Sequence, residues 1–188
     1  MKKSIACFLV CAIIVSFASV GCQNNGTKKY TWSIEMLNTT GKTAEETKND
    51  YEANWDSLFE KIVVNYDGTI TFFCTEEQRV RWVENRNNLI SSLYQTADRN
   101  GMQLWISEDR REYEVTVNPN DDNALALNLI YLLTALNGQC YLYQLFSDIP
   151  NKDIVVSFSI INAKNGNVVA SDIFPGGAGV SIYPDDWN

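Results

Sequence analysis

The sequence predicts an α+β fold with a mainly antiparallel sheet and two or three helices. Long segments repeat apolar residues every three or four positions, which is typical of helices that bury one face. Several shorter segments alternate apolar and polar residues or are rich in β-branched and aromatic types, which indicates strands. No internal repeat, low-complexity segment or interdomain linker is evident, so we expect residues 30–188 to form a single domain.

The first elements of this domain follow from alternation and from a helix-capping signal. Alternating apolar residues predict a strand over 30–37. Thr43 stands three residues before Glu46, which is the spacing of a capping box, and apolar residues then recur at helical spacing. We therefore expect a helix over 44–64, followed by a strand over 69–74.

A long second helix and two strands are expected next. Thr75 and Gln78 repeat the capping-box spacing and predict a helix over 76–99. Its expected buried stripe consists of Val80, Val83, Ile90, Leu93, Tyr94 and Ala97. Residues 102–107 and 112–117 read as strands, and the alternation in the second predicts one buried and one solvated face.

The remaining elements complete the order β-α-β-β-α-β, counted from Thr69. A third, largely uncharged helix is expected from residues 118–121 to Asn137, with Gly138 as its stop. Residues 140–146 are apolar on both faces and predict a covered strand, and 154–162 with 167–174 predict a hairpin. This order resembles that of the ferredoxin-like, split β-α-β fold with added strands.

The N-terminal residues predict export from the cytoplasm. Lys2 and Lys3 precede an apolar run over 5–20, which is the pattern of a signal peptide over residues 1–21. The run is shorter than the roughly 20 residues that a membrane-spanning helix requires.

The end of this run, Ser19-Val20-Gly21-Cys22, resembles the lipobox of bacterial lipoproteins, although Ser19 stands where that family most often has Leu. The resemblance implies cleavage before Cys22 and attachment of acyl chains, including a diacylglycerol on its sulfur. Ser16-Phe17-Ala18 also fits cleavage by the ordinary signal peptidase, which would leave Cys22 without lipid. Residues 22–29 are polar and predict a short tether that holds the domain on the outer side of the cell membrane or at the outer membrane.

Composition excludes several classes of function. The chain has 23 acidic and 15 basic residues, a net charge of −8, and removal of Lys2 and Lys3 makes it more acidic. An acidic domain repels phosphate backbones, so we expect no nucleic-acid partner. The chain has no histidine, which excludes Ser-His-Asp and Cys-His catalysis as well as histidine-ligated zinc. We predict no metal and no cofactor.

Other motifs do not support a catalytic site. The oxygen-rich segment 118–123 has Asn123 where a calcium loop needs glycine, and the glycines of 176–179 lack the lysine of a phosphate-binding loop. Glu108, Asp109, Glu112 and Glu114 supply carboxylates near one turn, but beside two arginines they are typical of a solvated hairpin. Cys74 and Cys140 form either a disulfide or two buried free thiols, and both alternatives remain open.

Aromatic residues of the C-terminal third are the best candidates for a binding surface. These are Tyr141, Tyr143, Tyr183 and Trp187. The alternative is that they form an aromatic layer of the core.

Three functions remain open. The first is a protein-interaction module, such as an envelope assembly subunit or an immunity-type lipoprotein that neutralises a toxin. The second is a carboxylate-dependent enzyme acting on cell-wall or glycan substrates. The third is a lipoprotein that binds a small ligand in an enclosed apolar pocket.

Overall fold

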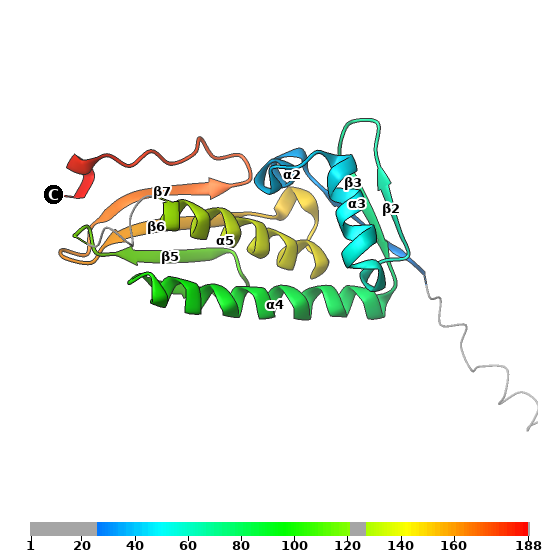
Figure 1. The fold of residues 1–188 in the computed structure, drawn as a ribbon, viewed down its shortest axis with the longest axis horizontal. Coiled ribbons are helices and arrows are strands. Elements are labelled where there is room, and N and C mark those ends of the chain that lie inside the picture. The colour runs from blue at the N-terminus through cyan, green and yellow to red at the C-terminus, as the bar shows by residue number, and fades with distance from the viewer. Residues whose placement is uncertain (1–25, 121–126, 188) are drawn as a thin grey trace, which may run out of the picture.

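Two β-sheets lie toward opposite ends of the molecule, and two long helices, α4 (Glu76–Arg99) and α5 (Leu127–Phe146), extend along the molecule between them (Figure 1). The computed structural model describes residues 26–120 and 127–187, so the expected signal peptide and Cys22 lie outside the described residues. The shorter elements are α2 (Ile34–Thr40), α3 (Ala44–Asn54), β1 (Lys28–Trp32), β2 (Lys61–Val64), β3 (Ile70–Cys74), β4 (Gln103–Ile106), β5 (Glu112–Val117), β6 (Val156–Asn162) and β7 (Val168–Phe174).

The seven described strands form two separate sheets. The first has the order β1-β3-β2 and is antiparallel throughout. The second has the order β4-β5-β6-β7 and is antiparallel except for the parallel pair of β5 with β6. The predicted α+β class is therefore confirmed.

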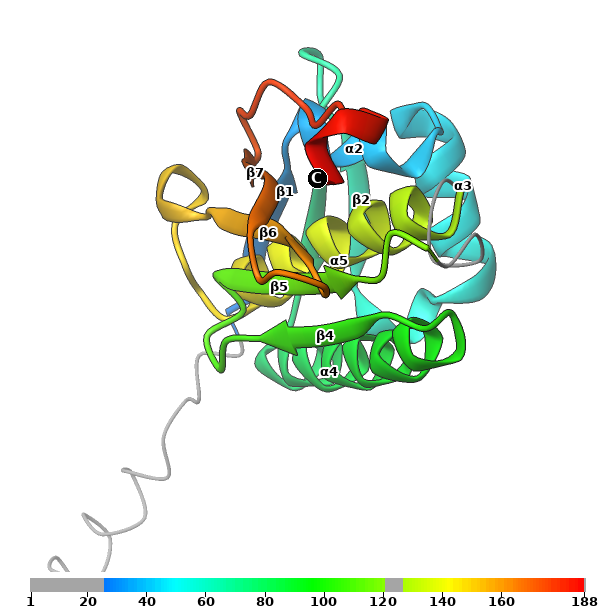
Figure 2. The ribbon, with the colours of Figure 1, turned by 90° about the vertical axis from the view of Figure 1, so that its left-hand side faces the viewer.

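The ferredoxin-like arrangement is not formed, although the elements from β3 to β6 follow the predicted order. A split β-α-β unit would need β3 in the same sheet as β4 to β6, but β1 and β2 occupy both edges of β3. The length of α4 explains the separation, because its 24 residues rise about 36 Å and carry the chain from one sheet to the other. Figure 2 shows the four strands of the second sheet following one another from α4 toward the C-terminal tail.

The two long helices give opposite outcomes for the predictions. The helix over 76–99 is confirmed, including its capping box. By contrast, α5 continues to Phe146, so both the predicted stop at Gly138 and the predicted strand over 140–146 are wrong. Gly138 lies inside α5 in a helical conformation, and a Cβ there would make only an ordinary van der Waals contact, 3.4 Å from Cε of Met36. The end of α5 is buried on nearly every side, and a short run that is apolar all round does not distinguish a helix from a strand.

Two predicted elements near the N-terminus are shorter than expected. The strand over 30–37 ends at Trp32, because Ser33 caps α2 by accepting a hydrogen bond from the backbone N–H of Met36 at 3.2 Å. The helix over 44–64 ends at Asn54. Residues 61–64 form β2 instead, since pairing with β3 buries Ile62.

The hydrophobic core has two clusters. The first lies between the three-stranded sheet and the helices and is rich in aromatic rings, among them Trp32, Phe72, Trp82 and Phe146. The second is mainly aliphatic and lies between the four-stranded sheet, α4 and α5. The predicted alternation in β5 is confirmed, with Tyr113, Val115 and Val117 buried and Glu112 and Glu114 exposed. The predicted hairpin of β6 and β7 is also confirmed.

None of the helices within 26–120 and 127–187 is long and apolar enough to cross a membrane. The oxygen-rich segment 118–123 falls partly outside the described residues.

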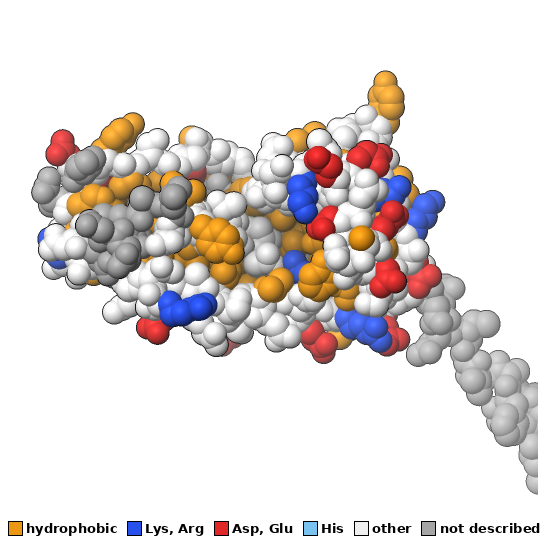
Figure 3. Space-filling model, in the orientation of Figure 1, with side chains coloured by type: hydrophobic (Ala, Val, Ile, Leu, Met, Phe, Trp, Pro, Cys, Tyr) orange, Lys and Arg blue, Asp and Glu red, His pale blue; other side chains and the backbone are white. Residues whose placement is uncertain are grey.

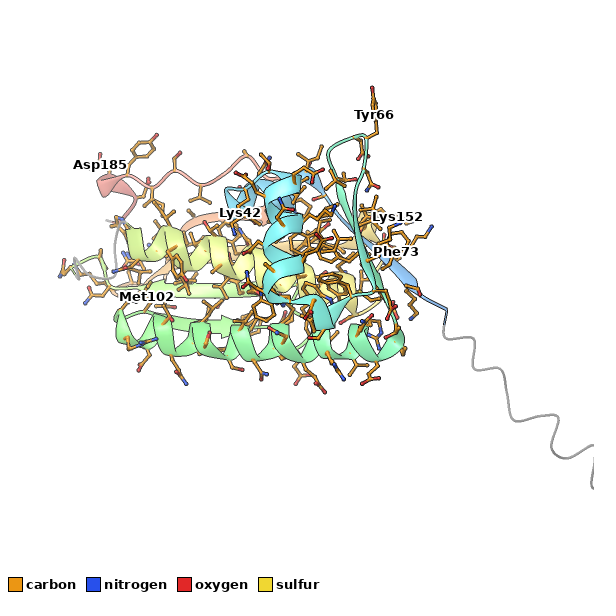
Figure 4. The ribbon with its side chains drawn as sticks, turned by 45° about the vertical axis from the view of Figure 1, so that its right-hand side comes forward. Lys42, Tyr66, Phe73, Met102, Lys152 and Asp185 are labelled. Atoms are coloured by element: carbon orange, nitrogen blue, oxygen red, sulfur yellow. The ribbon has the colours of Figure 1, made fainter. Side chains whose placement is uncertain are left out.

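Figure 4 shows Tyr66 at the tip of the hairpin between β2 and β3, where its fully exposed ring points away from the rest of the molecule.

Candidate functional site

Arg86 is the one charged side chain that is buried in the described part of the chain, with 3% of its surface exposed. It lies in the middle of α4, in a buried row with Trp82 and Ile90. These three residues are spaced four apart and therefore share one face of the helix. The fold thus places a positive charge in the row that packs against the rest of the protein.

The contacts of Arg86 are with neutral groups. Its Nη1 donates to Oε1 of Gln139 at 3.0 Å, and its Nη2 donates to Oδ1 of Asn85 at 3.2 Å. The guanidinium lies over the ring of Trp82, with Cζ 4.9 Å from the ring centroid. Within residues 26–120 and 127–187, no carboxylate forms an ion pair with Arg86, and its Nε–H is buried without a hydrogen-bond acceptor. A buried charge in this state is unfavourable for folding.

Arg86 lines a pocket of about 320 Å³ between α2, α3, α4 and α5, which we call the Arg86 pocket. The other lining residues are Trp32, Met36, Thr39, Thr40, Tyr51, Tyr131, Thr134, Ala135, Gly138, Gln139 and Leu142. Figure 3 shows hydrophobic side chains around a hollow where α3 faces α5, with a basic group recessed among them. The pocket is therefore mostly apolar, with one positive charge in its lining.

A second buried donor without an acceptor belongs to the same pocket. Nε1 of Trp32 is buried and makes no hydrogen bond to any described residue. The ring of Trp32 meets that of Trp82 edge to face, with centroids 6.4 Å apart, and the guanidinium of Arg86 also lies over the Trp82 ring. Two unsatisfied N–H donors thus lie around one aromatic ring, and each normally requires an acceptor when buried.

Charge states in the pocket follow from burial. Burial lowers the pKa of Arg86, and the Tyr51 hydroxyl partly offsets this shift. A guanidinium nevertheless stays protonated at neutral pH. Burial also raises the pKa of Tyr51, although the charge of Arg86 opposes that change. Tyr51 is therefore a neutral phenol, and the positive charge of Arg86 is left without a counterion in the described chain.

Comparison with protein-family models, curated proteins and solved structures finds no match. The arguments about function therefore rest on the geometry of this chain.

The four predicted surface aromatics do not share one surface. Tyr141 is 1% exposed and belongs to the first core cluster, which follows from the continuation of α5 beyond Gly138. Tyr143 is half-buried with Arg110 over its ring, and Trp187 is half-buried against the second core cluster. Tyr183 is 65% exposed, so it alone of the four is free for contact over most of its ring.

Cys74 and Cys140 are free, buried thiols in the structure. They lie in different core clusters, and Sγ of Cys74 donates to the backbone oxygen of Leu58 at 3.4 Å. Burial raises the pKa of both thiols to about 12, so neither is a ready nucleophile at neutral pH.

The acidic residues between 108 and 114 lie on the hairpin of β4 and β5. Asp109 accepts hydrogen bonds from the Ser107 hydroxyl at 2.8 Å and the Arg111 backbone N–H at 3.2 Å, and its pKa is lowered by the bond from Ser107. Glu112 and Glu114 point to solvent from β5. Among the described residues, no group of three or more acids or cysteines is placed to hold a metal ion.

The glycine-rich loop after β7 binds a carboxylate of the chain itself. The backbone N–H of Gly179 donates to Oδ2 of Asp172 at 2.7 Å. Gly177 must be glycine here, because a Cβ would lie 2.3 Å from Oδ1 of Asp172 and 2.2 Å from the oxygen of Ile173. The Asp172 carboxylate therefore already occupies the backbone N–H of Gly179 in this loop.

The sequence contained a signal for Arg86 that the predicted stripe of α4 passed over. That stripe started at Val80, which is exposed, and left out Trp82, which is fully buried. A row drawn through Trp82 and Ile90 at intervals of four includes Arg86, and a charge at a buried helical position marks a candidate site. Trp32 and Gln139 come from distant segments, and no local pattern placed them beside Arg86.

Proposed function

We propose that the protein is a membrane-anchored, extracytoplasmic lipoprotein that acts by binding, and that the Arg86 pocket is its binding site. The anchor rests on the resemblance of residues 19–22 to a lipobox. The binding site rests on one observation, the burial of the Arg86 guanidinium without a carboxylate partner among the described residues.

The energetics of a buried charge support this assignment. A charged group removed from water costs several kcal/mol unless an opposite charge or good hydrogen bonds replace its hydration. Gln139 and Asn85 supply two neutral acceptors, which leaves the charge itself uncompensated. An anionic ligand in the adjoining pocket would supply both the opposite charge and the missing acceptor.

Catalysis by carboxylates receives less support from the arrangement. Such an enzyme needs two acids about 5–10 Å apart facing one cleft. The acids of the β4–β5 hairpin are on a solvated turn and on the outer face of the sheet, and no acidic side chain of residues 26–120 or 127–187 lines the Arg86 pocket.

A protein partner is the second candidate, favoured by two exposed apolar side chains on α5. Ile130 and Tyr131 are 61% and 64% exposed, and Tyr131 lies at the rim of the Arg86 pocket. An acidic or C-terminal group of a partner protein would then enter the pocket while apolar contacts form around it.

The experiment uses the full chain in lipid nanodiscs and an extract of cell envelope split into a small-molecule and a protein fraction. We expect a fraction that contains the ligand to raise the melting temperature of the wild-type protein and of Arg81→Met, but not of Arg86→Met. Arg81 is the matched control, because it lies on the same helix with half of its side chain exposed. A rise that is equal in Arg86→Met, or no rise with either fraction, would contradict the proposal.

A further inference from the structure

We propose that the ligand of the Arg86 pocket is a small carboxylate anion with an apolar or aromatic body. This inference rests on the proposed function and goes further, because it assigns a charge, a size and a polarity to the ligand.

The single positive charge of the pocket matches a single negative charge. Among the described residues, Arg86 is the one lysine or arginine in the lining, and no aspartate or glutamate accompanies it there. A phosphate monoester carries close to two charges and more acceptor atoms, and sites for it combine several cations or backbone N–H groups. The acidic chain as a whole, with a net charge of −8, also disfavours a polyanion.

The unsatisfied N–H donors of the pocket residues favour a ligand that only accepts hydrogen bonds, such as a carboxylate. Two of the residues that line the pocket each have a buried donor without an acceptor, Nε–H of Arg86 and Nε1–H of Trp32. A carboxylate has two oxygens that accept hydrogen bonds and no donor, so beside Arg86 it would add acceptors without adding an unsatisfied donor of its own. The bond from a guanidinium to a carboxylate is also among the stronger hydrogen bonds in proteins.

The walls and the volume define the body of the ligand. Met36, Leu142 and Ala135 supply aliphatic surface, and Trp32 and Tyr51 supply aromatic rings. A volume of about 320 Å³ accommodates on the order of ten non-hydrogen atoms, if each occupies about the share of one water molecule. A carboxylate joined to one phenyl ring or to a short alkyl chain fits these limits.

Gly138 provides a second way to test the pocket without altering its charge. It lines the pocket from α5, and a Cβ there would meet the flexible end of Met36 rather than backbone. Leucine favours the helical conformation more than glycine does, so Gly138→Leu should keep α5 intact while its side chain takes up pocket volume. Loss of binding in this variant would report on the space and not on the arginine.

The test is calorimetric titration of the full chain in nanodiscs with chosen probes, using empty nanodiscs as the blank. The probes are 3-phenylpropanoate and hexanoate, the neutral 3-phenylpropanamide, and phenyl phosphate. We expect both carboxylates to bind the wild-type protein and Arg81→Met with one site, and the amide to bind at least about tenfold more weakly. Arg86→Met should bind the carboxylates as weakly as the amide, and Gly138→Leu should lose all of them.

Four results would overturn the inference. These are equal affinity for acid and amide, tighter binding of phenyl phosphate, unchanged binding by Arg86→Met, and no binding of either carboxylate. If the carboxylates fail while the small-molecule fraction of the envelope still acts through Arg86, the proposed function stands and the ligand class is wrong. If only the protein fraction acts, the occupant is a protein partner. If neither acts, both proposals fail.

Discussion

The ring of Trp82 in α4 stacks on the ring of Phe146 at the end of α5, with centroids 4.2 Å apart and planes 6° from parallel. Both side chains are fully buried in the first core cluster. This contact fixes the last turn of α5 against the first half of α4, one helical turn before Arg86. Aromatic packing therefore holds together two of the helices that line the Arg86 pocket.

Replacement of Phe146 by alanine should lower the free energy of unfolding by about 3–5 kcal/mol, because a large buried ring is lost and a cavity remains. Urea denaturation of the full chain, followed by tryptophan fluorescence, measures this loss. Phe73→Ala is the control, since Phe73 is only partly buried and has Lys29 and Lys61 over its ring. Equal losses in the two variants would contradict the assigned role of the stack.

An ion cluster at the start of β1 should make stability sensitive to acid. Asp148 accepts from Nζ of Lys28 and from the Tyr30 hydroxyl, each at 2.7 Å. Burial alone would raise the pKa of Asp148, but these two hydrogen bonds outweigh it and lower that pKa below 3.8. A lowered pKa means that the contribution to stability is complete above about pH 4 and is lost as the pH falls through the folded-state value.

The variant Asp148→Asn should therefore show a smaller fall in melting temperature between pH 5 and pH 3 than the wild-type protein. Asparagine suits this position, because Asp148 has a φ of 64° and asparagine tolerates the left-handed region. Melting curves at a series of pH values measure the difference. Identical pH profiles would show that this cluster does not set the acid sensitivity.

The sequence predicted the elements whose patterns are local and long. The helix over 76–99 and the β6–β7 hairpin have capping and turn residues at fixed offsets, and the structure confirms both. The continuation of α5 beyond Gly138 places Cys140 and Tyr141 in the two core clusters, which are built from segments far apart in the sequence. The same limit applies to the Arg86 pocket, because Trp32 and Gln139 reach Arg86 only through the tertiary fold.

The two cysteines should be unreactive and unbridged in the folded protein. Their thiols are buried with a pKa of about 12, so a thiol-specific reagent at pH 8 should label Cys74 and Cys140 only after denaturant is added. Mass spectrometry counts the labels before and after unfolding. A fall in melting temperature on addition of a reducing agent would instead indicate a disulfide.

The lipobox resemblance predicts that Cys22 is the first residue of the mature protein and carries acyl chains. Intact-mass measurement of the chain from the membrane fraction should show the added lipid, and Cys22→Ala should abolish it and release the protein from the membrane. Cys74→Ala is the control and should leave the lipid in place. A mature chain that begins at Ser19 without lipid would contradict this prediction.

The central claim is that Arg86 serves a ligand and does not stabilise the fold. Methionine at this position keeps much of the side-chain volume and removes a buried charge that has no ion pair, so we expect the variant to be no less stable than the wild-type protein. The ligand, by contrast, should stabilise the wild-type protein by about 2.7 kcal/mol at a hundred times its dissociation constant.

The most direct test is the melting temperature of the wild-type protein and of Arg86→Met, each with and without 3-phenylpropanoate. We predict that Arg86→Met melts at or above the wild-type temperature without the probe and gains nothing from it. The wild-type protein should gain about 5–10 °C at saturating probe. An Arg86→Met protein that melts well below the wild-type protein, and that still gains the same increment from 3-phenylpropanoate, would contradict the account.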